Sequence, residues 1–199
     1  MSTITVVKKD GFVAIAADTL TKWGSTKESA EYIVNHEKII RVGDSFLGVS
    51  GSASVALALQ HLFANSKNKA RLHSVMDIFG TWTILHEEMK DSYFLKPDED
   101  EEDSVESTRM NVLIANPRGI FGVGAYRYVQ EFSRFYSHGI GADYAMGAMY
   151  AVYNSKRSAL EIARLGVEAA AEFDDATGLP ILSHEIRLKD APQDDAPPA

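Results

Sequence analysis

The sequence contains no cysteine and no long apolar run, and both absences exclude whole classes of protein. Without cysteine there are no disulfides and no thiolate metal sites, so we expect a cytoplasmic protein. No stretch approaches the roughly 20 apolar residues that a membrane-spanning helix requires. The apolar residues 4–7 are followed by two lysines and a turn, unlike the apolar core of a secretory signal. We therefore expect no membrane partner.

Positive charge is also scarce, because 20 Lys and Arg stand against 28 Asp and Glu and the formal net charge is −8. Binding to phosphates requires clustered Lys and Arg, so nucleic acid is not an expected partner. The six histidines lack the HxxxH spacing and the nearby carboxylates of zinc sites, and no metal or other cofactor is expected. The acidic run over 98–103 lacks the glycine and the spaced ligands of a calcium loop, and it is expected to be a solvated loop.

The length and composition are those of one globular domain. The chain has 199 residues, 45% of them hydrophobic, which is enough for a substantial core. We expect a single domain over residues 1–189. The Pro- and Asp-rich tail over 190–199 has no residue that would join a core, and we expect it to be disordered.

Alternating apolar residues predict strands in the first fifty positions. Two strands joined by a tight Asp-Gly turn are predicted within residues 4–18, and a second strand pair within 39–49. The polar stretch 19–37 between them is expected to be irregular. Further strands are predicted over 110–115 and 120–123, and a last one over 181–186.

Two pairs of helices are predicted between these strands. The first pair covers residues 53–63, rich in small residues, and 73–92. Apolar residues recur at helical spacing in the second of these helices, at Met76, Phe79, Leu85 and Met89. The second pair covers 143–153 and a helix that begins with the capping box of Ser158 and Glu161.

Strands and helices thus alternate in groups along the chain, which favours antiparallel sheets covered by helical layers over a parallel sheet. The expected fold class is α+β, a four-layer αββα sandwich. In this arrangement two antiparallel sheets pack face to face and each is covered on its outer side by a helix pair.

The chain also begins with a chemically unusual possibility. If Met1 is removed, Ser2 carries a hydroxyl and a free α-amine on the same residue. The pKa of an α-amine lies close to neutrality, so the amine can accept a proton from the hydroxyl during attack on a carbonyl. By itself this pattern also fits an ordinary small residue after Met.

A series of short motifs then decides between these interpretations. After Ser2 they are Ala17-Asp18, Lys38-Ile39, Ser50-Gly51-Ser52, Gly139-Ile140-Gly141 followed by Tyr144-Ala145, and Asp174-Asp175-Ala176-Thr177-Gly178. In this order, over about residues 2–188, the motifs resemble those of the proteasome β-subunit family of N-terminal nucleophile hydrolases. The bacterial members, similar to the HslV-type peptidases, are the nearest comparison, because only Met1 would have to be removed. The resemblance implies the sandwich fold described above.

The resemblance also implies roles for individual residues. Ser2 takes the place of the family's nucleophilic threonine, with its own amine as the base. Lys38 would hold that amine uncharged, and Asp18 would keep Lys38 protonated. Gly51 would offer its backbone N–H to the oxyanion. A structural ion pair and a plain turn are the alternative explanations for these three residues.

Five further residues would complete the site. Asp174 and Thr177 would orient the terminal amine, although without the resemblance an ordinary turn at a helix end is the preferred explanation of both. The substrate would bind as an added strand beside Thr21. Val49 and Ala53 would line a modest apolar pocket for the side chain before the cleaved bond.

The resemblance implies a peptidase of the threonine-peptidase class that acts on unfolded polypeptides. It would assemble from identical subunits into stacked rings, with an ATP-dependent unfoldase as a possible partner. Ile140 occupies the position of a family serine near the amine, which leaves open a weak or inactive ring protein. An amidohydrolase acting on a small amide is a third interpretation. Thr3 would be a nucleophile only if trimming went one residue further.

Overall fold

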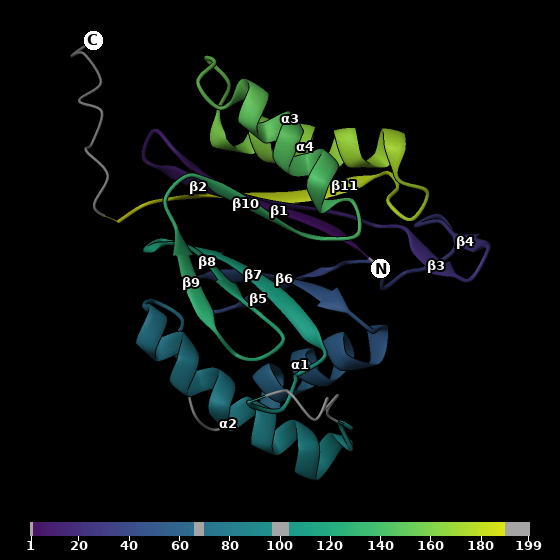
Figure 1. Cartoon of the computed structure of the whole chain (residues 1–199), viewed down its shortest axis with the longest axis vertical. Helices are drawn as coiled ribbons and strands as arrows, with labels where there is room; N and C mark the ends of the chain where they lie inside the picture. The colour runs from purple at the N-terminus through teal and green to yellow at the C-terminus, as the bar shows by residue number, and fades with distance from the viewer. Residues whose placement is uncertain (1, 66–69, 97–103, 190–199) are drawn as a thin grey trace.

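The computed structural model describes residues 2–65, 70–96 and 104–189. Two large antiparallel sheets face each other, with strand orders β10-β1-β2-β11 and β5-β6-β7-β8-β9. Helices α3 and α4 cover the outer side of the first sheet, and α1 and α2 cover that of the second (Figure 1). The expected four-layer αββα sandwich is therefore confirmed. Met1, the acidic run 98–103 and the tail 190–199 lie outside the described residues.

The bounds of the elements follow the sequence predictions closely. The first sheet contains β1 (Thr3–Lys9), β2 (Phe12–Asp18), β10 (Phe135–Gly139) and β11 (Ile181–Arg187). The second contains β5 (Ile39–Val42), β6 (Ser45–Gly51), β7 (Met110–Asn116), β8 (Gly119–Val123) and β9 (Val129–Phe132). The helices are α1 (Ala53–Asn65), α2 (Val75–Tyr93), α3 (Ala142–Val152) and α4 (Ala159–Phe173).

Alternation along β1 explains why this strand can serve two layers. Ile4 and Val6 are fully buried between the two sheets, whereas Val7 packs on the outer side against α3 and α4. Thr5 also faces outward, and its Oγ1 donates to the Ala163 carbonyl of α4 at 2.8 Å. Side chains two apart on a strand share a face, so Thr3 belongs to the outer, helix-facing side. Ser2 precedes it at the end of the strand.

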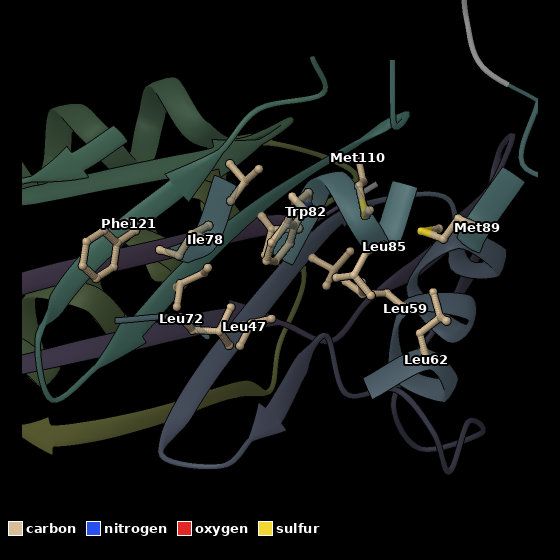
Figure 2. Close-up of a cluster of buried hydrophobic side chains, with 14 residues drawn as sticks. Leu47, Leu59, Leu62, Leu72, Ile78, Trp82, Leu85, Met89, Met110 and Phe121 are labelled. Carbon is tan, nitrogen blue, oxygen red and sulfur yellow. The ribbon is translucent and has the colours of Figure 1, made fainter. Parts of the chain in front are cut away.

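The buried face of α2 agrees with the prediction at Leu85 and Met89 and differs from it at Met76 and Phe79. Figure 2 shows Ile78, Trp82, Leu85 and Met89 in the cluster between α2 and the second sheet, and all four are buried. Met76 is 73% exposed and Phe79 46% exposed, so these two residues do not belong to the core. Both sets recur at helical spacing, and burial of the large indole of Trp82 determines which face meets the sheet.

Four strands were missed in the sequence. The stretch 19–37 is not wholly irregular, because it contains the short hairpin of β3 (Thr21–Trp23) and β4 (Thr26–Glu28). Strands β9 and β10 lie at the edges of different sheets and mix polar with apolar residues, so hydrophobic alternation does not reveal them. Stacking of Phe132 on Tyr136, with ring centroids 4.2 Å apart, joins the two strands where the chain crosses between the sheets.

Two features concern the described residues alone. None of their helices has the length and apolar character required to cross a membrane. Their His, Asp and Glu side chains form no group of three that could hold a metal ion.

Candidate active site

Ser2 lies at the open end of the gap between the two sheets and is 5% exposed. Its carbonyl accepts a hydrogen bond from the Ile140 N–H at 2.9 Å. The next residue, Thr3, pairs with Gly139 in the ladder between β1 and β10. The start of β1 is therefore fixed by the segment that leads into α3.

The two glycines around Ile140 allow this close approach. Gly139 has φ of +110°, and a Cβ there would lie 1.8 Å from the Ser2 carbonyl oxygen. A Cβ at Gly141 would lie 2.5 Å from Thr3 Oγ1. No side chain fits at either position, which explains the Gly-x-Gly pattern physically.

A buried ion pair lies beneath the end of β1. Lys38 Nζ donates to Asp18 Oδ1 at 2.8 Å and to the Leu20 carbonyl at 2.7 Å. The Asp18 side chain is fully buried and that of Lys38 is 12% exposed. Burial lowers the pKa of the Lys38 ammonium, and Asp18 opposes that shift. The expected pair is thus present.

Asp18 also organises the surrounding backbone. Its carboxylate accepts from the N–H groups of Thr3 at 2.9 Å, Leu20 at 3.1 Å and Gly178 at 3.3 Å. These hydrogen bonds, together with Lys38, compensate the cost of burying the charge. One carboxylate therefore connects the first strand, the end of the second strand and the loop after α4.

That loop reaches β1 through hydroxyl groups. Thr177 Oγ1 lies 2.6 Å from Thr3 Oγ1 and donates to Asp174 Oδ2. The Gly141 N–H donates to Thr3 Oγ1 at 3.2 Å. Thr177 and Asp174 were expected to face the terminal amine; in this arrangement Thr177 contacts Thr3, and Asp174 accepts a hydrogen bond from Thr177. Thr3 is fully buried, and its hydroxyl is held on the side away from the two hollows described next.

Two hollows meet at Ser2 and Gly51, which line both. The Lys38 hollow has a volume of about 460 Å³ and is named after Lys38, which lines it. It is also lined by the three residues that were expected to bind substrate, Thr21, Val49 and Ala53. Of these, Val49 is buried while Ala53 is exposed. The hollow therefore combines apolar walls with charged groups, namely the ammonium groups of Lys22 and Lys38 and the carboxylate of Glu37.

The Asp143 hollow, of about 820 Å³, opens on the other side of Ser2. Tyr136 and His138 from the edge strand β10 form one wall, and Asp143 from the first turn of α3 forms another. Burial lowers the pKa of His138 below its ordinary value. This hollow was not anticipated in the sequence, because strand β10 was not.

Sequence reasoning considered Thr3 only as a nucleophile after further trimming, and it did not place Lys22, which lines the Lys38 hollow, in the site. Lys22 forms an ion pair with Asp175, which connects strand β3 to the loop that carries Thr177. The available signal for Thr3 was the strand alternation, which turns its side chain towards α4 and that loop. No sequence pattern indicated Lys22, because its hairpin and the loop that carries Asp175 are far apart in the chain.

The chain is similar to solved structures of known proteins. No protein-family model matches this chain, and no curated protein matches it. The structure of Thiobacillus denitrificans BPH matches with 56% identity over 94% of this chain and 99% of that one, with a TM-score of 0.90. The same protein in complex with epoxomicin matches with 55% identity over 94% and 98% of the two chains, with a TM-score of 0.88.

A more distant match concerns the fold alone. Eukaryotic HslV from Trypanosoma brucei is 18% identical over 93% of this chain and 99% of that one, with a TM-score of 0.70. Its likeness agrees with the two helix-covered sheets. The identity of more than half the residues to BPH, over nearly the full length of both chains, assigns this chain to the proteasome β-subunit family, among the bacterial proteasome homologues.

Proposed function

We propose that this protein is an endopeptidase with Ser2 as its nucleophile once Met1 has been removed. The observation that carries the proposal is the position of Ser2, which lines both hollows and adjoins the residues bonded to the buried Asp18–Lys38 pair. A hydroxyl at the meeting point of two open hollows suits a long substrate that passes over it. The family to which the chain belongs supports peptide hydrolysis as the reaction.

In the proposed reaction, Ser2 Oγ attacks the carbonyl carbon of the substrate and its proton passes to the Ser2 α-amine, directly or through water. The amine then protonates the leaving nitrogen, the peptide C–N bond breaks, and an ester remains on Ser2. Water hydrolyses that ester and restores the hydroxyl. The Gly51 N–H would stabilise the developing oxyanion.

The charged groups have complementary roles in this scheme. The Lys38 ammonium, which lines the same hollow as Ser2, favours the neutral form of the nearby amine. Asp18 holds Lys38 in place and fixes the backbone of Thr3 next to the nucleophile. Asp174 and Thr177 position the start of β1 through the Thr3 hydroxyl. Asp174 and Thr177 therefore affect the amine indirectly, through Thr3.

The substrate would be an extended, unfolded polypeptide. Its backbone would lie beside Thr21 of β3, and the side chain before the cleaved bond would enter the Lys38 hollow between Val49 and Ala53. We propose assembly into stacked rings of identical subunits in the cytoplasm, with an ATP-dependent unfoldase as the partner that delivers substrate. Mass photometry of the purified protein tests the ring.

The experiment that tests the nucleophile is intact mass spectrometry before and after incubation with a peptide epoxyketone such as epoxomicin. We expect purified protein without Met1, one added inhibitor mass, and no added mass on Ser2→Ala. Ser133→Ala, an exposed serine between β9 and β10, is the matched control and should be labelled normally. Retention of Met1 in protein that still cleaves peptides, or labelling of Ser2→Ala, would overturn the assignment.

Ile140 favours a second candidate function, a ring protein of the same fold with weak or no peptidase activity. Its side chain is 53% exposed in the Asp143 hollow and offers no hydroxyl to the proton-transfer network. Loss of Met1 without any labelling or cleavage would support this candidate. Ile140→Ser, which supplies a hydroxyl, would then be expected to raise the labelling rate. The open hollows give no support to the third interpretation, an amidohydrolase for a small amide.

A further inference from the structure

We propose that the Asp143 hollow binds the part of the substrate that follows the cleaved bond, and that it prefers a lysine or arginine side chain there. This inference rests on the proposed function, because it takes Ser2 as the point of cleavage. It adds a second binding site, with a defined chemistry, to the apolar site before the cleaved bond.

The position of the Asp143 hollow relative to Ser2 indicates which part of the substrate it would bind. Ser2 and Gly51 are the described residues shared by both hollows, so they mark the boundary between them. A chain that lies beside Thr21 and places its carbonyl carbon at Ser2 fills the Lys38 hollow with the residues before the cleaved bond. The residues after that bond continue past Ser2, and the Asp143 hollow is the space that adjoins Ser2 on this path.

The walls of the hollow suit a long aliphatic side chain with a cationic end. Tyr136, Ile140 and Met146 supply apolar contacts, and Asp143 supplies a carboxylate. Lysine and arginine pack their methylene groups on apolar surface while the charged end reaches a polar partner. The exposed Ile140, which offers nothing to catalysis, gains a role here as part of the wall.

The charge distribution favours a cation over an anion. Asp143 is the one carboxylate among the residues that line this hollow, and no lysine or arginine is among them. Burial lowers the pKa of His138, so its imidazole is neutral at pH 7. Asp143 is exposed and forms no hydrogen bond or ion pair with any of the described residues, so its charge is available to a ligand.

Asp143 has a second property that an experiment must separate from binding. It lies in the first turn of α3, where a negative charge stabilises the helix through its dipole. A purely structural role would change the unfolding free energy of Asp143→Asn and would treat all substrates alike. A binding role changes the ratio between substrates that differ only in the residues after the cleaved bond.

The test compares two internally quenched peptides that share every residue up to the cleaved bond and carry either Lys or Glu at the two positions after it. Cleavage rates are divided by the rate of epoxyketone labelling of the same protein. We expect wild type to cleave the Lys peptide about two- to fivefold faster, the range of an exposed ion pair. Asp143→Asn should bring the ratio close to one. Asp91→Asn, which removes an exposed carboxylate of α2 outside both hollows, should keep the wild-type ratio.

A binding measurement keeps the two proposals distinguishable. Fluorescence anisotropy of the same two peptides, each carrying a fluorescent label in place of the quenched pair, is recorded on Ser2→Ala with and without Asp143→Asn. Preferential binding of the Lys peptide that disappears with Asp143→Asn supports the proposed site. This holds even if epoxyketone does not label wild type, because failed labelling counts only against Ser2 as the nucleophile. Equal cleavage and equal binding of the Lys and Glu peptides, or a preference unchanged in Asp143→Asn, would overturn the proposed site.

Discussion

The hydroxyl oxygens of Thr3 and Thr177 lie 2.6 Å apart although 174 positions separate the two residues in the chain. Both residues are buried, and the contact joins β1 to the loop after α4. Thr177 also donates a hydrogen bond to Asp174, and Thr3 also accepts one from the Gly141 N–H. Ser2 is thus positioned by a hydroxyl network attached to its neighbour.

Thr3→Val should therefore reduce both stability and reactivity, since it removes the hydroxyl and keeps the shape of the side chain. The Gly141 N–H loses its partner, and we expect a loss of about 1–3 kcal/mol in unfolding free energy. Displacement of the adjacent Ser2 should slow epoxyketone labelling about 10- to 100-fold. Urea unfolding and labelling kinetics measure the two effects. Thr3→Ser is the control and should remain near wild type; a slow, destabilised Thr3→Ser would count against the hydroxyl.

Gly141→Ala should be harmful and Gly147→Ala should not. An added Cβ at Gly141 lies 2.5 Å from Thr3 Oγ1 and 2.7 Å from Ala170 Cβ, whereas one at Gly147 meets nothing within 4 Å. We expect Gly141→Ala to lower the unfolding free energy by about 1–3 kcal/mol. Gly147→Ala, inside α3, which begins directly after Gly141, should raise it by about 0.5–1 kcal/mol. Similar effects of the two changes in chemical denaturation would show that the close approach at Gly141 does not matter.

Lys38→Met should destabilise the fold by about 3–5 kcal/mol, because it leaves the fully buried carboxylate of Asp18 without its cationic partner. Labelling of Ser2 should also be lost. The double variant Asp18→Asn with Lys38→Met should recover part of the stability and none of the labelling. Urea unfolding of the two single variants and the double variant gives the coupling energy. Additive losses would indicate that the two side chains do not act as a pair.

Stability should fall on mild acidification because of His86, a buried residue of α2. Its Nε2 lies 3.0 Å from Glu106 Oε2, and burial lowers the pKa of the imidazole below its ordinary value of 6.5. The unfolded chain then binds a proton at a pH where the folded chain does not. Stability from this group is complete above pH 6.5 and declines as the pH falls from 6.5 through the folded pKa, by at most about 1.4 kcal/mol per pH unit.

Urea unfolding between pH 7.5 and 5 checks this expectation in wild type and His86→Gln. The variant should show a shallower decline, whatever its stability at pH 7.5. His138 and His184 also have lowered pKa values through burial, so a residual slope is expected in the variant. Equal slopes in the two proteins would show that His86 does not contribute.

The layers of this fold could be predicted because each one leaves a local pattern. Alternation at Ile4 and Val6 identifies the first strand, and the capping box of Ser158 identifies the start of α4. Strand β10 leaves no such pattern, since its pairing with β1 is what makes it a strand. The sequence also left open which face of α2 is buried, because Met76 and Trp82 each belong to a set of apolar residues that recur at helical spacing.

The sequence by itself determined the order of strands and helices, the serine beside the initiator methionine, and the residue types that resemble the proteasome β-subunit family. These depend on neighbours a few positions apart, where periodicity and short motifs carry the information. Only the tertiary structure decided that Thr3 would contact Thr177, that Asp18 would bond to three separate segments, and that a second hollow would open beside Asp143. Such contacts arise when distant segments pack together, and no local pattern in the chain encodes their distances.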